Sequence, residues 1–327
     1  MEYPKFKVCC RCFTFNQAKY ITDAMNGFTM QQTSFPFVCT IVDDASTDGE
    51  QDVIRKYVED NFDFSEGSVA FHKETDYAHI TYAQHKTNKN CYFAVLYLKE
   101  NHYSQRKPKM GYLSEWRDMC EYEAICEGDD WWKDETKLNK QVNVLEPHPS
   151  YSMCFHNAII HYEENGSDAL FANLEERVYY PKECISKWLV PTASIVYRMK
   201  YSNYIKDLKI DNERIIYGDN LLVLSMLHYG EVFAIAEPMS VYRKHSGGAV
   251  YSITEAQHDK FYKQLLHCKA IFKEYSQLLN VPLSDTCFNQ ALKALKRFNL
   301  LKFLTCIFLS MYYSPRRCFH SIFSLIC

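Results

Sequence analysis

The pattern of apolar and polar positions predicts strands alternating with helices at the start of the chain. Residues 6–13 and 38–42 are short runs of apolar and β-compatible side chains, which are typical of buried strands. Between them, apolar residues recur at helical spacing over 17–32, and a second helical pattern covers 49–57. This order of strand, helix, strand and helix indicates a sheet that is at least partly parallel, with helices on its faces.

The remainder of the chain continues this pattern and ends in helices. Further strands are expected at residues 122–126, 152–161, 192–198 and 231–235. Further helices are expected at residues 92–99, 135–145, 221–229, 255–280 and 284–304. We therefore expect an α/β fold, a mixed sheet flanked by helices, over residues 1–250. A C-terminal helical extension, basic and apolar, is expected over residues 251–327.

Composition narrows the class of protein. A chain of 327 residues that is 47% hydrophobic and 24% charged builds a folded core, which excludes a disordered or fibrous protein. The net charge of −3 argues against a general nucleic-acid binder. The 14 cysteines are scattered and lack repeated Cys-x-x-Cys pairs, so we expect free thiols in a reducing cytosol rather than disulfides or a zinc site. Neither a secretory signal nor a run of about 20 apolar residues is present, which predicts a cytoplasmic protein.

Charge is distributed unevenly, and the end of the chain is basic. No acidic residue follows Asp285, whereas six basic residues do. Residues 298–313 are apolar around most of a helix, and Arg316 and Arg317 follow them. Such a segment is suited to the interface of an anionic membrane, so peripheral membrane contact through residues 298–327 is expected. The alternative is packing of this segment against the rest of the chain or a partner.

A first group of carboxylates follows the second predicted strand, in the segment Asp43-Asp44-Ala45-Ser46-Thr47-Asp48-Gly49. Ligands of open α/β sheets bind at the carboxyl ends of strands, where carboxylates can accept hydrogen bonds from a base or a ribose. The alternative is a turn in which a polar side chain caps the next helix. The chain lacks the glycine-rich phosphate loops of dinucleotide-binding and P-loop proteins.

A second group of carboxylates lies in Cys126-Glu127-Gly128-Asp129-Asp130-Trp131-Trp132. Three carboxylates within four residues repel one another unless a cation or a proton is shared between them. Oxygen ligands suit Mg²⁺ or Mn²⁺, which complete their coordination with water and phosphate oxygens. The alternative is a solvated acidic turn leading into the helix at 135–145.

Taken in order and spacing, several segments of residues 6–248 resemble family-two glycosyltransferases of the Rossmann-like GT-A fold, in their bacterial surface-polysaccharide variant. The two acidic segments carry most of this resemblance. The other segments are Phe13-Thr14-Phe15-Asn16, Lys137-Leu138-x-Lys140-Gln141-Val142, Tyr217-Gly218-Asp219 and Tyr242-Arg243-Lys244-His245.

The resemblance implies an inverting enzyme that uses a nucleotide-sugar donor and a divalent metal, Mn²⁺ or Mg²⁺. It places Asp219 at the catalytic base. The donor and its nucleotide are expected to contact Phe13, Phe15, Asn16, Asp43, Asp44, Glu127, Asp130 and Arg243. The metal is expected to contact Asp129, Glu127 and His245.

The chain departs from the family at several of these positions. Phe13 and Phe15 replace a usual Thr and Tyr, which weakens polar contact with the base, and Glu127 replaces a usual Asp. Gly218 removes the acidic neighbour of the base Asp219. Simpler interpretations also remain open: a helix cap for Asp219, a surface histidine for His245, and a solvated cation for Arg243.

We therefore predict transfer of a sugar, with UDP as the expected nucleotide, to a glycan or lipid-linked acceptor in surface-polysaccharide biosynthesis. The protein is expected at the inner face of the cell membrane, without nucleic acid as a partner. Residues 188–194 resemble the acceptor side of the family, although a core strand with a turn explains them equally. One alternative function is a sugar-phosphate nucleotidyltransferase, which carries a glycine-rich loop where this chain has Phe13–Asn16. The other is a non-catalytic nucleotide-sugar-binding module.

Overall fold

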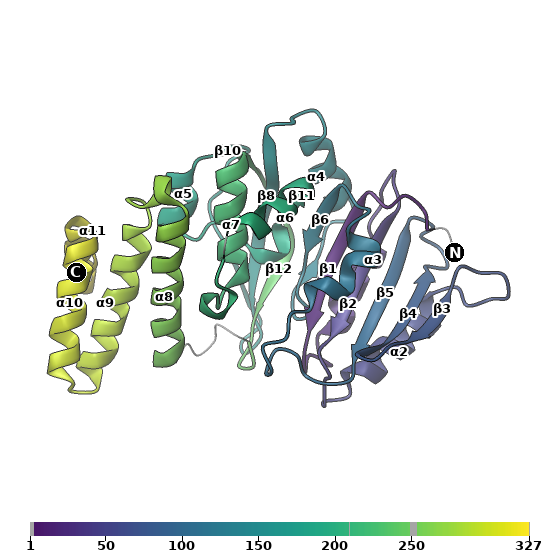
Figure 1. Cartoon of the computed structure of the whole chain (residues 1–327), viewed down its shortest axis with the longest axis horizontal. Helices are drawn as coiled ribbons and strands as arrows, with labels where there is room; N and C mark the ends of the chain where they lie inside the picture. The colour runs from purple at the N-terminus through teal and green to yellow at the C-terminus, as the bar shows by residue number, and fades with distance from the viewer. Residues whose placement is uncertain (1–2, 209, 249–253, 327) are drawn as a thin grey trace. The chain divides into compact units, whose positions relative to one another are not determined.

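The computed structural model describes residues 3–208, 210–248 and 254–326 (Figure 1). The chain divides into two compact units, which we call the sheet unit and the helical unit. The sheet unit comprises Met1–Val178, Val190–Ser202 and Val232–His245, and the helical unit comprises Tyr179–Leu189, Asn203–Glu231 and Ser246–Cys327. The domain boundary predicted between residues 250 and 251 lies outside the described residues.

The described strands form one twelve-stranded mixed sheet with the order β10-β12-β8-β11-β6-β1-β2-β5-β4-β3, while β7 pairs with β12 and β9 with β8. The strands are β1 (Val8–Thr14), β2 (Phe37–Asp43), β3 (Phe71–Glu74), β4 (Ala78–Gln84), β5 (Cys91–Leu98), β6 (Tyr122–Ile125), β7 (Trp131–Trp132), β8 (Tyr151–Tyr162), β9 (Ser167–Leu170), β10 (Arg177–Tyr179), β11 (Val196–Arg198) and β12 (Glu231–Lys244).

The centre of the sheet is parallel, and this determines where loops converge. Strands β6, β1, β2 and β5 run parallel, and antiparallel strands extend the sheet on both sides. Thr14 at the end of β1 is paired with Asp43 at the end of β2. The loops that follow β1, β2 and β6 therefore leave the same edge of the sheet. The predicted α/β class with a mixed sheet is confirmed.

One predicted element has the wrong type. Residues 92–99 were expected to be helical, but they belong to β5, which is buried at every position between β2 and β4. A strand covered on both faces has no alternation of polar and apolar residues, so a short apolar run does not distinguish it from a buried helix.

Four described helices lie wholly in the sheet unit. They are α1 (Ile21–Thr29), α2 (Glu50–Asn61), α3 (Ser114–Arg117) and α4 (Lys137–Leu145). Helix α1 buries Ile21, Ala24, Met25 and Phe28, which are the apolar positions that predicted it. It also passes so close to β7 that a Cβ on Gly27 would lie 2.8 Å from the backbone nitrogen of Trp132.

The other helices are α5 (Pro181–Ser186), α6 (Lys200–Asp207), α7 (Gly218–Tyr229), α8 (Glu255–Ile271), α9 (Asn280–Lys296), α10 (Leu300–Tyr313) and α11 (Pro315–Ile326). Short 3₁₀ turns cover Met110–Leu113, Thr192–Ser194, Asn212–Arg214 and Lys273–Tyr275. The C-terminal helical extension is confirmed by α8 to α11. The single helix expected at 284–304 is wrong, because a turn separates α9 from α10.

The thirteen cysteines of the described residues are all free and buried. None of the described helices is both long enough and apolar enough to cross a bilayer.

Candidate active site

The loops after β1 and β2 are joined at the carboxyl edge of the sheet by hydrogen bonds. The Asn16 amide N–H donates to Ser46 Oγ over 2.9 Å, and the Thr47 amide N–H donates to Asn16 Oδ1 over 2.8 Å. The Ala18 amide N–H donates to Asp48 Oδ2 over 2.9 Å. Asn16, predicted to contact the nucleotide, thus has one side-chain oxygen and its backbone amide engaged in holding the two loops together.

Glu50, which the sequence interpretation missed, lies at the centre of this loop pair. Its buried carboxylate accepts hydrogen bonds from the Thr14 hydroxyl, from the Gln17 amide N–H over 2.9 Å and from Ser46 Oγ over 2.8 Å. Burial raises the pKa of Glu50. The only sequence signal was an acid in the first turn of α2, which is a common helix-terminal preference.

The turn after β6 packs directly against the loop after β1. A Cβ on Gly128 would lie 2.7 Å from Thr14 Cβ and 2.5 Å from Gln17 Oε1. The Gly128 amide N–H donates to the carbonyl of Phe13 over 3.3 Å. Only glycine therefore fits between the acidic residues Glu127 and Asp129.

The two adjacent aspartates after β2 have different environments. Asp43 is buried, and its Oδ1 accepts hydrogen bonds from the Ser46 amide over 3.1 Å and from Gln51 Nε2 over 2.6 Å. Its Oδ2 is also buried but has no hydrogen-bond partner among the described residues. Burial raises the pKa of Asp43. Unpaired buried oxygens are uncommon, so this one is available to a ligand donor.

Asp44 holds a loop that follows β5. Its carboxylate accepts hydrogen bonds from the amides of His102 over 2.7 Å and Tyr103 over 3.0 Å, and Lys109 Nζ lies 2.7 Å from Oδ2. The same lysine Nζ lies 5.0 Å from the ring centroid of Phe13. Phe15, the next aromatic residue of the β1 loop, has 43% of its surface exposed. Of these predicted nucleotide contacts, Phe15 thus presents an open aromatic face.

Asp129 and His245 are brought together as predicted for metal ligands. Asp129 Oδ2 lies 3.1 Å from His245 Nε2, although the two residues are far apart in the sequence. His245 follows β12 and is only 8% exposed, with its ring 4.6 Å from that of Tyr20. It is therefore not a surface histidine. Glu127, the other predicted ligand, is exposed in the turn after β6.

Asp130 and Arg243 fix the backbone on which Asp129 stands. The buried Asp130 carboxylate accepts a 2.9 Å hydrogen bond from the Arg243 amide N–H. Burial and the neighbouring Asp129 hold the pKa of Asp130 well above its usual range. Arg243 Nε in turn donates to the Asp129 carbonyl over 2.9 Å.

Arg243 is a buried cation rather than a solvated one. Its guanidinium lies between two rings, 4.5 Å from the centroid of Tyr20 and 4.4 Å from that of Trp131. It donates to Asp23 over 2.5 Å and to Glu163 over 2.7 Å. All three of its nitrogens thus have partners within the chain.

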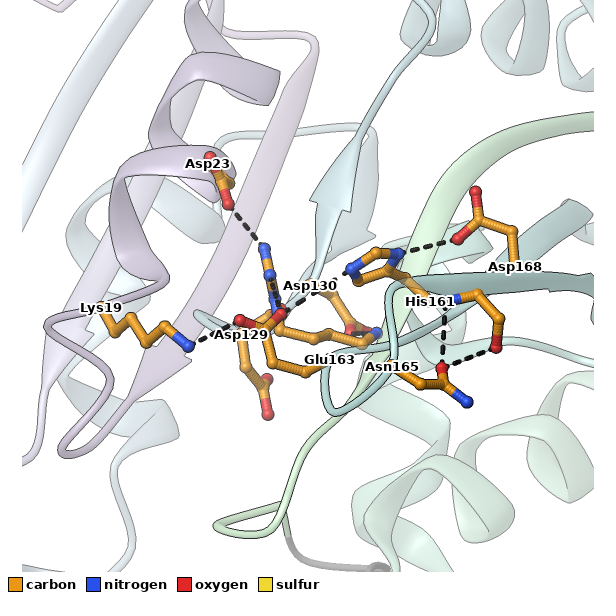
Figure 2. Close-up of polar contacts among 10 residues, drawn as sticks. Lys19, Asp23, Asp129, Asp130, His161, Glu163, Asn165 and Asp168 are labelled. Atoms are coloured by element: carbon orange, nitrogen blue, oxygen red, sulfur yellow. Dashed lines mark hydrogen bonds and ion pairs between the residues drawn. The ribbon is translucent and has the colours of Figure 1, made fainter.

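Glu163 is a second residue that the sequence did not indicate, and it connects Lys19 with Arg243 (Figure 2). It accepts from Lys19 Nζ over 2.6 Å and from Arg243 over 2.7 Å. Hydrogen bonds from Lys19, and then from Arg243, lower the pKa of Glu163 to about 2. Figure 2 shows these polar contacts continuing to His161 of β8, whose Nδ1 lies 2.7 Å from Oδ1 of Asp168 in β9.

The predicted base Asp219 belongs to the helical unit. It lies half-buried in the first turn of α7, one residue inside the start of the helix at Gly218. The N-cap is Tyr217, and Asp219 Oδ1 accepts the Asn220 amide N–H over 2.8 Å within the first turn of the helix.

The donor set suits a metal whose coordination is completed by a ligand. Among the described residues, no three His, Cys, Asp or Glu side chains are grouped to hold a metal by themselves. Asp129 Oδ2 and His245 Nε2 supply two adjacent donors. Mg²⁺ and Mn²⁺ accept so few protein ligands where phosphate oxygens and water supply the others. The residues present therefore fit such an ion together with a diphosphate.

Comparison with solved structures identifies the fold. Residues 1–349 of S. aureus TarS in complex with UDP superpose with a TM-score of 0.62 at 16% identity, covering 96% of this chain and 82% of that chain. The complex of the same protein with UDP-GlcNAc gives a TM-score of 0.60 at 15% identity, covering 96% and 83%. The chain therefore has a glycosyltransferase fold.

Sequence comparison gives relatives without an assigned activity. The uncharacterized proteins Rv1520 of Mycobacterium tuberculosis and Mb1547 of Mycobacterium bovis are 30% identical over 245 residues. The match covers 73% of this chain and 59% of each relative, so the chain spans about three-fifths of their length. No protein-family model matches the chain.

Proposed function

We propose that this chain is an inverting, metal-dependent glycosyltransferase of the GT-A type that uses a nucleoside-diphosphate sugar, with UDP as the nucleotide. The observation that carries the proposal is the 3.1 Å approach of Asp129 Oδ2 and His245 Nε2 beside the carboxyl edge of the parallel strands. That edge is where ligands of open α/β sheets bind. A fold similar to that of TarS, which was solved with UDP-GlcNAc, supports the same choice of ligand.

The nucleotide is proposed to lie against the loops after β1 and β2. The exposed face of Phe15 is suited to stack on the base, and the unpaired Asp43 Oδ2 can accept a hydrogen bond from a donor on the nucleoside. Phe13 and Asp44 shape the wall of this site through Lys109 and the loop that it holds. Asn16 and Glu50 keep the two loops in position.

Asp129 and His245 are proposed to hold Mn²⁺ or Mg²⁺, with Glu127 reaching it from the exposed turn. When bound, the ion supplies Lewis-acid stabilisation of the charge that develops on the leaving diphosphate. Arg243 orients Asp129 by binding its carbonyl, and Asp130 fixes the turn through the Arg243 amide.

Asp219 is proposed as the general base. The acceptor oxygen forms a bond to the anomeric carbon as the bond from that carbon to the diphosphate breaks, and the acceptor proton passes to the Asp219 carboxylate. A single displacement of this kind inverts the anomeric centre and needs no covalent intermediate. The acceptor is a glycan or lipid-linked hydroxyl in surface-polysaccharide biosynthesis, and the reaction takes place at the inner face of the membrane.

Calorimetric titration of UDP and GDP, with and without Mn²⁺, tests the donor site. We expect UDP to bind in a metal-dependent manner, and Asp129→Ala to abolish that dependence. Asp60→Ala on the exposed face of α2 is the control, because the Asp60 carboxylate pairs with Lys56 on the same helix and lies outside the proposed site. Failure of the native chain to bind either nucleotide with metal would overturn the donor site.

A turnover assay tests the base. Asp219→Asn is expected to retain UDP binding and to lose transfer by at least about a hundredfold, which is the usual contribution of a general base. Normal turnover by this variant would remove Asp219 from the mechanism. Nucleotide binding by the native chain with no transfer to any glycan or lipid-linked acceptor would favour the non-catalytic binding module.

A further inference from the structure

The turn between α9 and α10 places a bulky aromatic residue where a helix usually ends in glycine. The Phe298 amide N–H donates to the Leu295 carbonyl over 3.0 Å, and the Asn299 amide N–H donates to the Ala294 carbonyl over 3.0 Å. These two bonds define a Schellman motif whose left-handed position is Phe298, with φ of 57°. A side chain with a Cβ is unfavourable in this conformation, and glycine or asparagine normally occupies it.

Phe298 receives no compensating burial from the described chain. Its side chain is 95% exposed at the end of the helical hairpin that Figure 1 shows at the C-terminal end of the chain. The residues around it in the sequence include further large exposed apolar side chains. These are Leu295, Leu300, Leu301 and Leu304, and we call residues 295–304 the α9–α10 tip. A strained residue whose side chain is not buried by the described residues points to a role in binding.

The apolar surface continues along α10 on the side away from α9. Ser310 on the inner side is buried, and its hydroxyl contacts Ser284 of α9 at 2.9 Å. Leu301, Phe308 and Tyr312 on the outer side are 79%, 69% and 71% exposed. The surfaces of soluble proteins rarely carry so many large apolar side chains together, and such a stripe usually contacts a membrane or another protein.

The charge around the α9–α10 tip indicates what it contacts. No acidic residue follows Asp285 in the sequence, and Lys296 and Arg297 immediately precede Phe298. Arg297 and Lys302 both pair with the single carboxylate of Glu255, which leaves this group net positive. A second copy docked through the same tip would present the same positive charge, whereas anionic lipid head groups complement it.

We propose that the α9–α10 tip inserts into the interface of an anionic phospholipid bilayer, with Phe298 as the inserted side chain and Lys296 and Arg297 at the head groups. A protruding aromatic and leucine cluster with a basic collar is the arrangement by which peripheral proteins bind such interfaces. The inference does not depend on the donor site, which lies in the sheet unit.

Co-sedimentation of the full chain with vesicles tests the tip. We expect binding to phosphatidylcholine vesicles that contain phosphatidylglycerol, and little binding to phosphatidylcholine alone. Phe298→Gly should weaken binding at least about tenfold, as expected for loss of one inserted aromatic side chain. Its melting temperature should stay the same or rise, because glycine suits a φ of 57°. Lys296→Glu should weaken binding more than about fivefold and remove part of its salt dependence.

Leu170→Ala is the matched control, because this leucine is 52% exposed on β9 of the sheet unit and should not change vesicle binding. Unchanged binding of Phe298→Gly, or no binding of the native chain to anionic vesicles, overturns the proposal. So does a concentration-dependent dimer that Phe298→Gly abolishes, because the occupant would then be a second copy. UDP titration of Phe298→Gly should match the native chain, which separates this test from that of the donor site.

Discussion

Lys109 Nζ lies 2.7 Å from Asp44 Oδ2. The Asp44 carboxylate also accepts hydrogen bonds from the backbone amides of His102 and Tyr103, in the loop that leads to Lys109. Asp44 is wholly buried in this arrangement. A carboxylate with three donors is a strong anchor, since hydrogen bonds to charged groups contribute more than neutral ones. Asp44 therefore acts on the predicted nucleotide site through the loop at residues 101–109.

Asp44→Asn should lower the free energy of unfolding by about 2 kcal/mol, because an amide replaces an oxygen that accepts hydrogen bonds and the Lys109 partner is lost. If both residues act through the loop, Asp44→Asn and Lys109→Met should weaken UDP binding by similar factors. Urea unfolding and calorimetry of the two variants measure these effects. A Lys109→Met chain with native UDP affinity beside a defective Asp44→Asn would show instead that Asp44 contacts the base directly.

The close packing at Gly128 gives a second prediction. Gly128→Ala places a methyl group 2.7 Å from Thr14 Cβ, so the turn that carries Asp129 must shift. Overpacking of this kind costs roughly 1–3 kcal/mol of stability. We expect the metal-dependent affinity for UDP to fall by at least about tenfold, since a displaced Asp129 no longer faces His245.

Gly111→Ala is the control for this substitution, because a Cβ there would meet no atom of the described residues within 4 Å. Its stability and UDP affinity should remain close to native. If Gly128→Ala also bound UDP and Mn²⁺ normally, the turn after β6 would not be part of the donor site.

The fold was predictable where one element has a clear period. Helix α1 buries one apolar stripe at helical spacing. Strand β2 is buried at every position, as β5 is, but its Val, Thr and Ile side chains are β-branched and favour a strand. Strand β5 is covered on both faces and has no period to detect. The break after α9 carries no glycine or proline, because Phe298 occupies the left-handed position, and the helical pattern therefore continues across it.

The site was predictable only in part, for a related reason. Asp129 and His245 lie in recognisable motifs, and the structure brings them together. The roles of Glu50 and Glu163 depend on partners in other segments, namely Thr14 and Gln17 for the first and Lys19 and Arg243 for the second. Nothing in the local sequence around either glutamate indicates those partners.

The titration of Glu163 predicts that the folded chain loses stability at low pH. Its pKa is lowered to about 2 from an ordinary 4.5, so the ionised form is favoured in the folded chain. The contribution of ionised Glu163 to the free energy of unfolding is therefore complete above about pH 4.5 and is lost as the pH falls towards 2. Because Lys19 is largely exposed and solvent screens its charge, we expect this contribution to be no more than about 1 kcal/mol. Urea unfolding of the native chain and Glu163→Gln should differ at pH 6 and converge near pH 2.5. A difference that stays constant over this range would contradict the assignment.

Lys137 predicts a gain of stability at high pH. Its side chain is wholly buried, and its amine has no hydrogen-bond partner in the part of the chain that the structure describes. The amine nitrogen lies 4.0 Å from the ring centroid of Trp132. Burial lowers the pKa of Lys137 from 10.5 to about 8. Between these two values the unfolded chain binds the proton and the folded chain does not, so stability rises with pH. The full rise is on the order of 3 kcal/mol. A favourable contact of the protonated amine with the Trp132 ring would make the rise smaller.

Lys137→Met isolates this effect, because methionine has a similar length and no charge. At pH 7 the variant should be at least as stable as the native chain, since it buries no protonated amine. Between pH 8 and 10 the native chain should gain stability relative to the variant. The comparison is made by urea unfolding in reducing buffer, and taking the difference between the two chains cancels the titration of the buried thiols and tyrosines. A difference that does not change with pH would mean that the folded chain keeps the lysine protonated, held by the face of Trp132.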